Sequence, residues 1–420
     1  MSKKNLFYEL QSRGFINNIS NTSDLISSLS STYINIYCGF DPTANSLHVG
    51  HLLPLFCLKW FQKYGHKIII LLGYATSLIG DPSFKEKERI LEIPDQLLQW
   101  TQSIINQIKK FFNEQNLKKP IILNNHDWFK SINIISFLRD IGKLFSVNNM
   151  INKKSVQNRI HRVDQGISFT EFSYSLLQAY DFLHLYKTHN VILQVGGSDQ
   201  WGNIVSGIDI IRKMYHKQVF GLTIPLLISE SGIKFGKTEN NKIIWLSSKR
   251  TSPYTFYQFW LNIDDKQVYP FLKLFTFIQL QEIEEIYHSN CKIQDVKLML
   301  ADFVTKFVHG ANKLCAVKRI TNNLFNGNFL DLKKSDFYQL QQDGMDSIKL
   351  SGSEDLKQIL VDSKFSASRS DAYRLIIGNA IKINNRKENN PNYKFENSDK
   401  LFNKFTILTK GKKKHILLSW

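Results

Sequence analysis

The chain has 420 residues, 43% of them hydrophobic and 21% charged, an ordinary composition for a soluble globular protein of two to four domains. Lysine and arginine outnumber aspartate and glutamate by 54 to 36, and the net charge of +18 favours a polyanionic partner such as a nucleic acid. A biased base composition of the gene would produce the same excess of lysine, so charge alone leaves both explanations open.

The cysteines and the first residues of the chain indicate its compartment. Cys38, Cys57, Cys291 and Cys315 form neither a C-x-x-C pair nor a zinc-binding spacing, and they suit a reducing environment. The first residues lack the apolar segment of a signal peptide, and Glu9 argues against a transit peptide. No apolar run reaches the roughly 18 residues that a membrane span needs. We therefore expect a cytoplasmic protein with no membrane partner.

The first part of the chain alternates between short apolar runs and longer amphipathic segments. Strands are predicted at 33–40, 67–73, 119–124 and 190–196, and helices at 48–64 and 95–112. Asn45 or Ser46 is the expected cap of the first helix, and Pro54 should bend this helix unless its first turns are irregular. The alternation predicts the α/β fold class, with a doubly wound, Rossmann-like domain over residues 1–225.

The rest of the chain changes character twice. Helical patterns at 253–262, 267–277, 280–288 and 293–309 predict an α-helical domain over residues 226–325. Residues 326–353 lack a clear periodicity and are predicted to be a linker. Residues 354–420 are predicted to form a small α+β domain, with two short helices and strands near 380–384 and 404–419.

One motif follows the first predicted strand and opens a helix: the residues from Phe40 to His51, which end in His-Val-Gly-His. Backbone N–H groups at a helix start attract phosphate, and Gly50 permits close approach of a nucleotide. His48 and His51 are three positions apart and can both donate hydrogen bonds to phosphate oxygens. A pair of ordinary histidines is the alternative. Their spacing does not suit a metal site, and no protein-bound metal is predicted.

A second motif, Lys-Phe-Gly-Lys-Thr at 234–238, lies far downstream. Lys234 and Lys237 are three positions apart, and Gly232 and Gly236 give the loop freedom to close over a triphosphate. Ammonium groups beside a leaving pyrophosphate would stabilise charge that grows in the transition state. The alternative is a solvated basic hairpin tip.

The two motifs resemble the HIGH and KMSKS signatures of class I aminoacyl-tRNA synthetases, and their variant forms resemble those of the bacterial tyrosyl-tRNA synthetases. Four further blocks carry the same resemblance, at 37–43, 80–83, 164–174 and 196–203. The blocks occur in family order over essentially the whole chain. Phe235 and Gly236 depart from the class consensus of Met and Ser, while both lysines are kept.

A polar stripe indicates the amino-acid pocket. Tyr174, Gln178 and Asp181 fall at i, i+4 and i+7, which is one face of a helix. A core helix with satisfied polar groups is the alternative interpretation. The resemblance implies that Tyr37 and Asp181 bind the phenolic hydroxyl of tyrosine and that Tyr174 and Gln178 contact its α-amino end. It adds two further tyrosine-binding positions, Asp81 and Gln200.

The resemblance also implies the nucleotide site, and with it ATP as a substrate that carries Mg²⁺ on its triphosphate. The implied ATP-binding residues are Cys38, Gly39, Asp41, His48, Gly50, His51, Gly197, Asp199 and Lys237. The residues implied to stabilise the reacting phosphates are Thr43, His48, His51, Lys85, Arg89, Lys234, Lys237 and Thr238.

Residues 354–420 resemble a small RNA-binding module shared by a ribosomal protein and pseudouridine synthases. The blocks 366–377 and 380–384 carry this resemblance, and Lys404, Lys410 and the lysines at 412–414 add charge that suits phosphate. Asn385 replaces the usual glycine and can occupy a left-handed turn. A solvated basic tail is the alternative.

The resemblance implies an enzyme that joins L-tyrosine to tRNA(Tyr) through tyrosyl-adenylate, the activity of a tyrosine--tRNA ligase. Two alternatives remain: a tryptophanyl-tRNA synthetase, and a non-catalytic RNA-binding protein on the same fold. Family resemblance also implies a homodimer, for which the apolar stretch 128–145, with Phe129, Ile134, Ile135 and Phe137, is a plausible interface. The alternative is that this stretch is core.

Overall fold

The computed structural model describes residues 6–83, 93–153, 156–157, 160, 166–227, 235–236, 242–289, 291–350, 355–411 and 414–420. The chain divides into two compact units. The first comprises Met1–Leu246 and Asp264–Ile293, and the second comprises Ser247–Ile263 and Gln294–Trp420. Among the described residues, no helix is long and apolar enough to cross a lipid bilayer.

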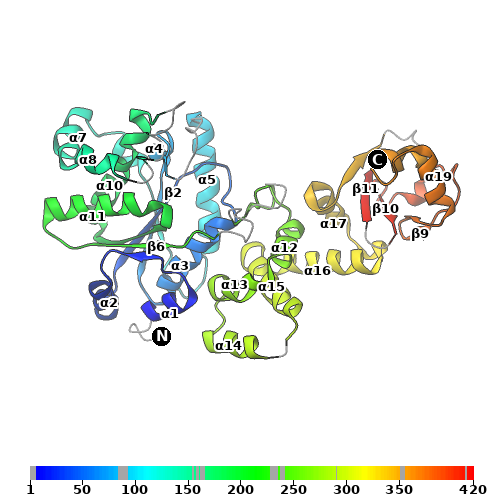
Figure 1. Ribbon diagram of the computed structural model, residues 1–420, viewed down its shortest axis with the longest axis horizontal. Helices are drawn as coiled ribbons and strands as arrows, with labels where there is room; N and C mark the ends of the chain where they lie inside the picture. The colour runs from blue at the N-terminus through cyan, green and yellow to red at the C-terminus, as the bar shows by residue number, and fades with distance from the viewer. Residues whose placement is uncertain are drawn as a thin grey trace. The chain divides into compact units, whose positions relative to one another are not determined.

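A six-stranded sheet forms the centre of the first unit (Figure 1). In spatial order its strands are β1 (Asn18–Ile19), β6 (Phe220–Ile224), β5 (Val191–Gly197), β2 (Asn35–Phe40), β3 (Lys67–Leu72) and β4 (Ile121–Asn124). Neighbouring strands are parallel except for β1, which pairs antiparallel with β6. The four predicted strands are confirmed as β2 to β5. Their continuous apolar runs suit a parallel sheet that is covered on both faces.

Helices cover both faces of this sheet, with α10 and α11 on one side of the strands and α1 and α3 on the other (Figure 1). Tyr37 of β2 and Leu71 of β3 share a core with Phe182 of α10. The helices of the unit are α1 (Leu6–Arg13), α2 (Thr22–Ser31), α3 (Leu52–Lys63), α4 (Tyr74–Ser77), α5 (Pro94–Phe111), α6 (His126–Phe129), α7 (Ile134–Asp140), α8 (Val147–Ile151), α10 (Phe169–His189), α11 (Trp201–Tyr215), α13 (Val268–Phe275) and α14 (Leu280–His288).

The start of α3 differs from the prediction of a helix capped at Asn45 or Ser46. A 3₁₀ turn, Val49–His51, precedes the helix, and His48 is its N-cap. Because α3 begins only at Leu52, Pro54 lies in its first turn, where a backbone N–H has no intrahelical acceptor. The proline therefore breaks no helical hydrogen bond.

A buried arginine explains why residues 264–293 belong with the first unit. The guanidinium of Arg13 donates to the carbonyl oxygens of Lys273 and Ile278, at 2.8 Å and 2.6 Å, and lies 4.1 Å from the centre of the Trp60 ring. A cation at the end of α13 also suits the negative end of the helix dipole. The helices predicted for 226–325 are confirmed, but α13 and α14 cluster with the sheet domain instead of forming one domain with the others.

The second unit combines helices with a five-stranded sheet of order β7-β11-β10-β8-β9. Its helices are α12 (Pro253–Leu261), α15 (Ile293–His309, which begins at the last residue of the first unit), α16 (Ala311–Asn326), α17 (Lys334–Gln339), α18 (Leu356–Asp362) and α19 (Arg369–Ile377). Its strands are β7 (Ser347–Lys349), β8 (Ile381–Ile383), β9 (Arg386–Lys387), β10 (Phe405–Lys410) and β11 (Lys414–Ser419).

The predicted linker at 326–353 differs from the structure. Its described residues include α17, a π-helical turn at Leu340–Gly344 and β7, which pairs with β11. Phe337 and Leu340 are buried against Phe405 in one apolar cluster. The left-handed conformation expected for Asn385 is confirmed by its φ of 72°.

Candidate functional site

A cavity of about 480 Å³ lies at the carboxyl ends of β2 and β5, where ligands bind in doubly wound sheets. The described residues that the sequence predicts for the site all line this one cavity. They are Tyr37, Cys38, Gly39, Asp41, Thr43, His48, Gly50, His51, Asp81, Tyr174, Gln178, Asp181, Gly197, Asp199 and Gln200. Lys85, Arg89, Lys234, Lys237 and Thr238 lie outside the described residues.

The polar stripe of α10 reaches the cavity as predicted. Ser168 caps the helix, because its side chain accepts the N–H of Glu171. From this start, Tyr174, Gln178 and Asp181 all line the cavity. The alternative, a core helix with every polar group satisfied, is wrong for Gln178, whose buried Oε1 atom has no hydrogen-bond partner among the described residues.

Asp181 lies at the deep end of the cavity, which we define by Tyr37, Gln178 and Asp181. Its two carboxylate oxygens accept the side-chain N–H groups of Trp128, at 2.9 Å, and of Asn125, at 3.1 Å. Burial raises the pKa of Asp181 well above its ordinary value, although these two hydrogen bonds oppose the shift. The two donors hold the carboxyl group in a fixed orientation. The sequence analysis does not anticipate either of them.

Tyr37 adds a second polar group to the deep end. The side chain is 1% exposed, and its hydroxyl has no hydrogen-bond partner among the described residues. Burial first, and then the nearby charge of Asp181, raise the pKa of Tyr37 well above its ordinary value, so the hydroxyl keeps its proton. A buried hydroxyl without a partner is costly, and a bound polar group would remove that cost.

Asp41 links the two halves of the cavity. Its carboxylate accepts the hydroxyl of Tyr174 at 2.8 Å and that of Thr76 at 3.0 Å. A Cβ atom on Gly73 would lie 1.9 Å from an oxygen of Asp41, so this carboxylate position requires glycine there. Thr76 and Asn125 come shortly after β3 and β4. Because the carboxyl ends of parallel strands meet at one edge of the sheet, this position in the sequence could have indicated that both residues lie near the site.

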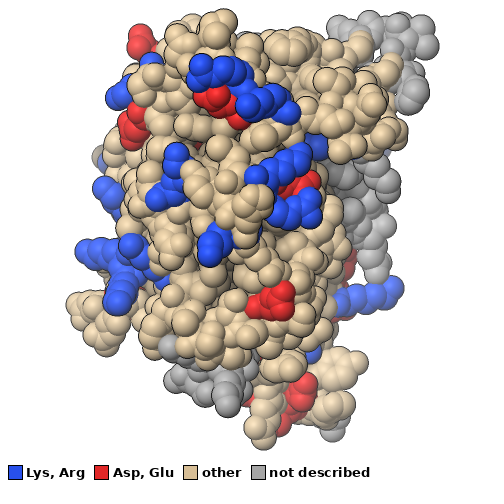
Figure 2. Space-filling view, turned by 90° about the vertical axis from the view of Figure 1, so that its left-hand side faces the viewer, with Lys and Arg blue, Asp and Glu red and all other residues tan. Residues whose placement is uncertain are grey.

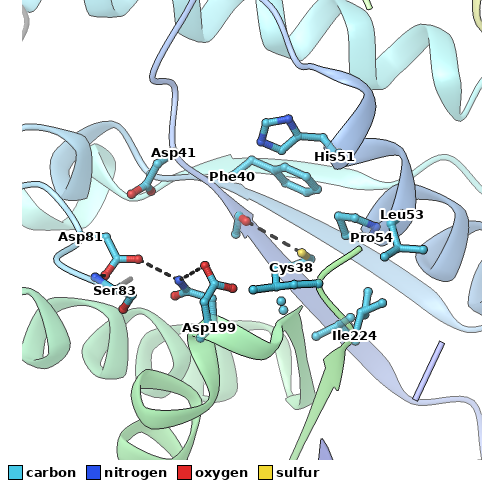
Figure 3. A pocket seen from close by; sticks show the side chains of 18 of the residues that line it. Cys38, Phe40, Asp41, His51, Leu53, Pro54, Asp81, Ser83, Asp199 and Ile224 are labelled. Atoms are coloured by element: carbon cyan, nitrogen blue, oxygen red, sulfur yellow. Dashed lines mark hydrogen bonds between the residues drawn. The ribbon is translucent and has the colours of Figure 1, made fainter. Parts of the chain in front are cut away.

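Carboxylates gather on one side of the cavity, where Asp41, Asp81 and Asp199 lie across from the apolar Leu53, Pro54 and Ile224 (Figure 3). Gln200 donates to Asp81 at 2.7 Å, and Asp81 also accepts the backbone N–H of Ser83 at 3.0 Å. The described lining residues include no lysine or arginine. This side of the cavity therefore suits a cationic group such as an ammonium ion.

The HVGH turn, residues 48–51, forms the opposite end of the cavity. The Nδ1 atom of His48 accepts the N–H of Gly50, and the Nδ1 atom of His51 accepts the N–H of His48, both at 3.1 Å. Burial lowers the pKa of His48 to about 4 and that of His51 well below its ordinary value, so both rings are neutral at pH 7. A neutral ring that accepts at Nδ1 carries its proton on Nε2, which leaves that atom as a donor.

The described part of the KFGKT motif lies beside this turn. A Cβ atom on Gly236 would lie 3.3 Å from the backbone nitrogen of Gly50, and the φ of Gly236 is +95°. The carbonyl oxygen of Gly236 accepts the N–H of Ile244 at 2.9 Å, and the ring of Phe235 lies 4.8 Å from that of Phe271 in α13. The two motifs, about 180 residues apart in sequence, thus meet at one end of the cavity.

No group of three or more His, Cys, Asp or Glu side chains in the described ranges is placed to hold a metal ion. The cavity offers instead buried hydrogen-bonding groups at the deep end, carboxylates along one side and the Nε2–H groups of two neutral imidazoles at the HVGH turn. Such a surface can bind and orient two ligands, one with a cationic group and one with phosphates.

Two protein families match this chain. The family described as tRNA synthetases class I (W and Y) matches residues 30–326, and the Tyrosine--tRNA ligase SYY-like C-terminal domain matches residues 336–418. The tyrosine--tRNA ligase of Buchnera aphidicola subsp. Baizongia pistaciae is 51% identical over 418 residues, which cover 99% of this chain and 98% of that protein. The Citrobacter koseri tyrosine--tRNA ligase is 51% identical over 424 residues, covering 100% and 99%.

Solved structures agree. A C-terminally truncated mitochondrial tyrosyl-tRNA synthetase from Aspergillus nidulans superposes with a TM-score of 0.68 at 31% identity, covering 76% of this chain and 94% of that chain. A tryptophanyl-tRNA synthetase from Encephalitozoon cuniculi, at 15% identity and a TM-score of 0.53, shares the fold alone. Identity of about half over essentially the whole length, together with both family matches, places this chain in the tyrosyl-tRNA synthetase family of class I tRNA synthetases.

Proposed function

We propose that this protein is a tyrosine--tRNA ligase, which uses ATP to attach L-tyrosine to tRNA(Tyr) through tyrosyl-adenylate. The observation that carries the proposal is the deep end of the cavity. There the hydroxyl of Tyr37, to which no described residue is hydrogen-bonded, lies near the buried carboxyl group of Asp181, which Asn125 and Trp128 hold in place. A phenolic hydroxyl offers one donor and two acceptor positions, which suits this pair of groups.

The amino-acid end of tyrosine would occupy the middle of the cavity. Asp81, with Gln200 hydrogen-bonded to it, lies beside Tyr174 and Gln178 in the cavity wall. The carboxylates on this side attract the α-ammonium group, and the neighbouring hydrogen bonds orient it. Phenylalanine would leave the buried groups of the deep end unpaired, which is the basis of selection against it. The general rule is documented with a tyrosyl-tRNA synthetase as its example.

The first step is attack of the tyrosine carboxylate on the α-phosphate of ATP, with release of pyrophosphate. The nucleophile is already ionised, so the step requires positioning and charge stabilisation rather than a general base. The Nε2–H groups of His48 and His51 and the hydroxyl of Thr43 would donate to phosphate oxygens, and Gly50 keeps the turn open to them. Cys38, Gly39, Gly197 and Asp199 would contact the nucleoside.

Positive charge for the leaving pyrophosphate has to come from elsewhere, because the described lining residues carry none. We assign it to Lys85, Arg89, Lys234 and Lys237, with Thr238 beside them, and to Mg²⁺ that enters on the triphosphate as part of the substrate. In the second step a terminal ribose hydroxyl of the tRNA attacks the adenylate and AMP leaves.

The test is ATP–pyrophosphate exchange by the full-length protein with each of the twenty amino acids. We expect exchange that depends on tyrosine. Exchange with tryptophan alone would identify the related synthetase instead, and no exchange with any amino acid would indicate an RNA-binding protein without catalysis. Formation of tyrosyl-tRNA on purified tRNA then tests the second step.

We also propose that the C-terminal sheet domain binds tRNA. Arg374 of α19 and Lys387 of β9 are exposed, and the chain as a whole carries a charge of +18. Binding through such groups falls steeply with salt. Arg374→Ala combined with Lys387→Ala should therefore weaken tRNA binding while tyrosine-dependent exchange persists. The compartment that we propose is the cytoplasm, which cell fractionation would test.

A homodimer is the assembly that we propose. Within the stretch 128–145, Trp128 and Phe137 are buried in the core, but Ile134 and Ile135 are 63% and 68% exposed. Leu138 and Val147 are exposed as well. Figure 2 shows this end of the first unit, where wide uncharged areas separate the lysine and arginine side chains. Light scattering of the purified protein should give about twice the mass of one chain, and Ile135→Asp should lower it.

A further inference from the structure

A third buried polar group lines the cavity at the level of Tyr37. Gln194 lies in β5, is 3% exposed and contributes to the cavity wall. In the parallel pairing of β2 with β5, Gln194 is the register partner of Tyr37. Register partners project to the same face of a sheet, so both side chains start from one level.

One atom of the Gln194 carboxamide has no hydrogen-bond partner among the described residues. Its Oε1 atom is buried and has no partner among the described residues, like the hydroxyl of Tyr37 and the Oε1 atom of Gln178 in the same cavity. A buried carbonyl oxygen without a donor destabilises the folded protein. Three such atoms around one cavity indicate groups that a ligand completes rather than errors of packing.

We propose that Gln194 is a further tyrosine-binding residue, which hydrogen-bonds within the phenol-binding group formed by Tyr37 and Asp181. This inference rests on the proposed function, because it takes tyrosine as the ligand. One arrangement gives a hydrogen-bond partner to the Tyr37 hydroxyl, to Oε1 of Gln194 and to the phenolic hydroxyl of the ligand. The phenolic oxygen accepts the hydroxyl proton of Tyr37, and the phenolic O–H donates a three-centre hydrogen bond to Asp181 and to Oε1 of Gln194. Phenylalanine cannot support this arrangement, so Gln194 would contribute to specificity.

The main test replaces the carboxamide by an apolar side chain of similar length. In Gln194→Met, the KM for tyrosine in the exchange assay should rise about 10-fold, the loss expected for one hydrogen bond to a ligand. The KM for ATP should stay within about twofold, and the ratio of kcat/KM for tyrosine to that for phenylalanine should fall about 10-fold. An unchanged tyrosine KM, or an equal rise for ATP, would overturn the proposal.

The thermal stability of the unliganded protein separates binding from a structural role. Because no described residue hydrogen-bonds to Oε1, Gln194→Met should unfold at the same temperature as the wild type or higher, while tyrosine should stabilise it less. A lower unfolding temperature together with an unchanged tyrosine KM would show that Gln194 is structural. Gln194→Glu keeps the length and an acceptor, so it should retain more of the tyrosine-to-phenylalanine ratio than Gln194→Met.

Gln62 provides a matched control outside the cavity. It is 2% exposed and its Oε1 atom is also unpartnered among the described residues, but its Nε2 atom donates to the carbonyl of Lys118 at 2.7 Å. Gln62→Met should lower the unfolding temperature and leave the tyrosine KM unchanged. Wild-type protein in the same assay distinguishes the two levels of failure. If the wild type shows no tyrosine-dependent exchange, the proposed function is refuted. If the wild type and Gln194→Met both show normal exchange, only the role of Gln194 is refuted.

Discussion

In the deep end of the cavity, Tyr37 and Gln178 carry buried oxygen atoms that no described group hydrogen-bonds, whereas in the HVGH turn the Nδ1 atoms of His48 and His51 both accept backbone N–H groups. The deep end therefore keeps unsatisfied hydrogen-bonding capacity in the free protein. In the turn both Nδ1 atoms already accept backbone N–H groups, so each ring has its Nε2–H group as the donor for a ligand.

This difference suits the two ligands. Selection of one amino acid among twenty benefits from buried groups that only the correct side chain satisfies, since a wrong ligand leaves them unpaired. A triphosphate needs no such selection, but it needs donors that are already oriented before it arrives. We therefore expect substitutions in the deep end to act on tyrosine, and substitutions in the turn to act on ATP.

The largest expected effect is that of Asp181→Ala. It removes the acceptor for the phenolic hydroxyl and leaves the donors on Asn125 and Trp128 without their partner. The KM for tyrosine should rise about 100-fold or more, because a hydrogen bond is lost and buried donors are left unsatisfied, while the KM for ATP changes little. Exchange kinetics with each substrate varied in turn measure both. Equal losses for tyrosine and ATP would contradict the division of the cavity into two ends.

The sequence was most informative where one local pattern decides the structure. The parallel strands were predictable because each is a short apolar run, as in Lys67–Leu72, and the stripe on α10 because Tyr174, Gln178 and Asp181 repeat with helical spacing. The helices in the segment at 326–353 were not predicted, because they are too short to show a periodicity: α17 spans six residues and the π-helical turn five.

The residues that surround Asp181 and Tyr37 could not be predicted from local sequence patterns. Asn125 and Trp128 follow β4 and donate to Asp181, whereas Gln194 lies in β5 and lines the cavity beside its register partner Tyr37. Only the strand order of the sheet brings these residues together. His48 was predicted to bind phosphate but not to cap the turn, because histidine is an uncommon capping residue and the capping role depends on its tautomer.

A smaller effect, confined to the nucleotide end, is expected from Gly50→Ala. The new Cβ atom would lie 2.9 Å from Cε1 and 3.0 Å from Nδ1 of His48, so the ring has to move and its hydrogen bond with the N–H of residue 50 weakens. We expect a loss of about 10-fold in kcat/KM for ATP, with the calorimetric affinity for tyrosine unchanged.

Gly142→Ala is the matched control for that substitution. Its Cβ atom would make only an ordinary contact, 3.6 Å from Leu138. Exchange kinetics should match those of the wild type. If Gly50→Ala weakened tyrosine binding as much as ATP use, the turn and the deep end would not be independent.

The last prediction concerns acid stability and tests the turn without ligands. Burial lowers the pKa of His48 from an ordinary 6.5 to about 4, so between these values the unfolded chain binds a proton that the folded chain does not. Stability from the neutral His48 is therefore complete above pH 6.5 and is lost as the pH falls towards 4. At pH 5 the loss is about 2 kcal/mol.

His48→Gln removes this titration. Between pH 7.5 and pH 5, the unfolding temperature of the first unit should fall less in His48→Gln than in the wild type. His288→Gln, on the exposed end of α14, should follow the wild-type profile. Parallel profiles for the wild type and His48→Gln would mean that the turn is open enough to water for the ring to take up its proton in the folded state. The hydrogen bonds of the HVGH turn would then not keep the His48 ring neutral. Only the unsatisfied groups of the deep end would still distinguish the two ends of the cavity.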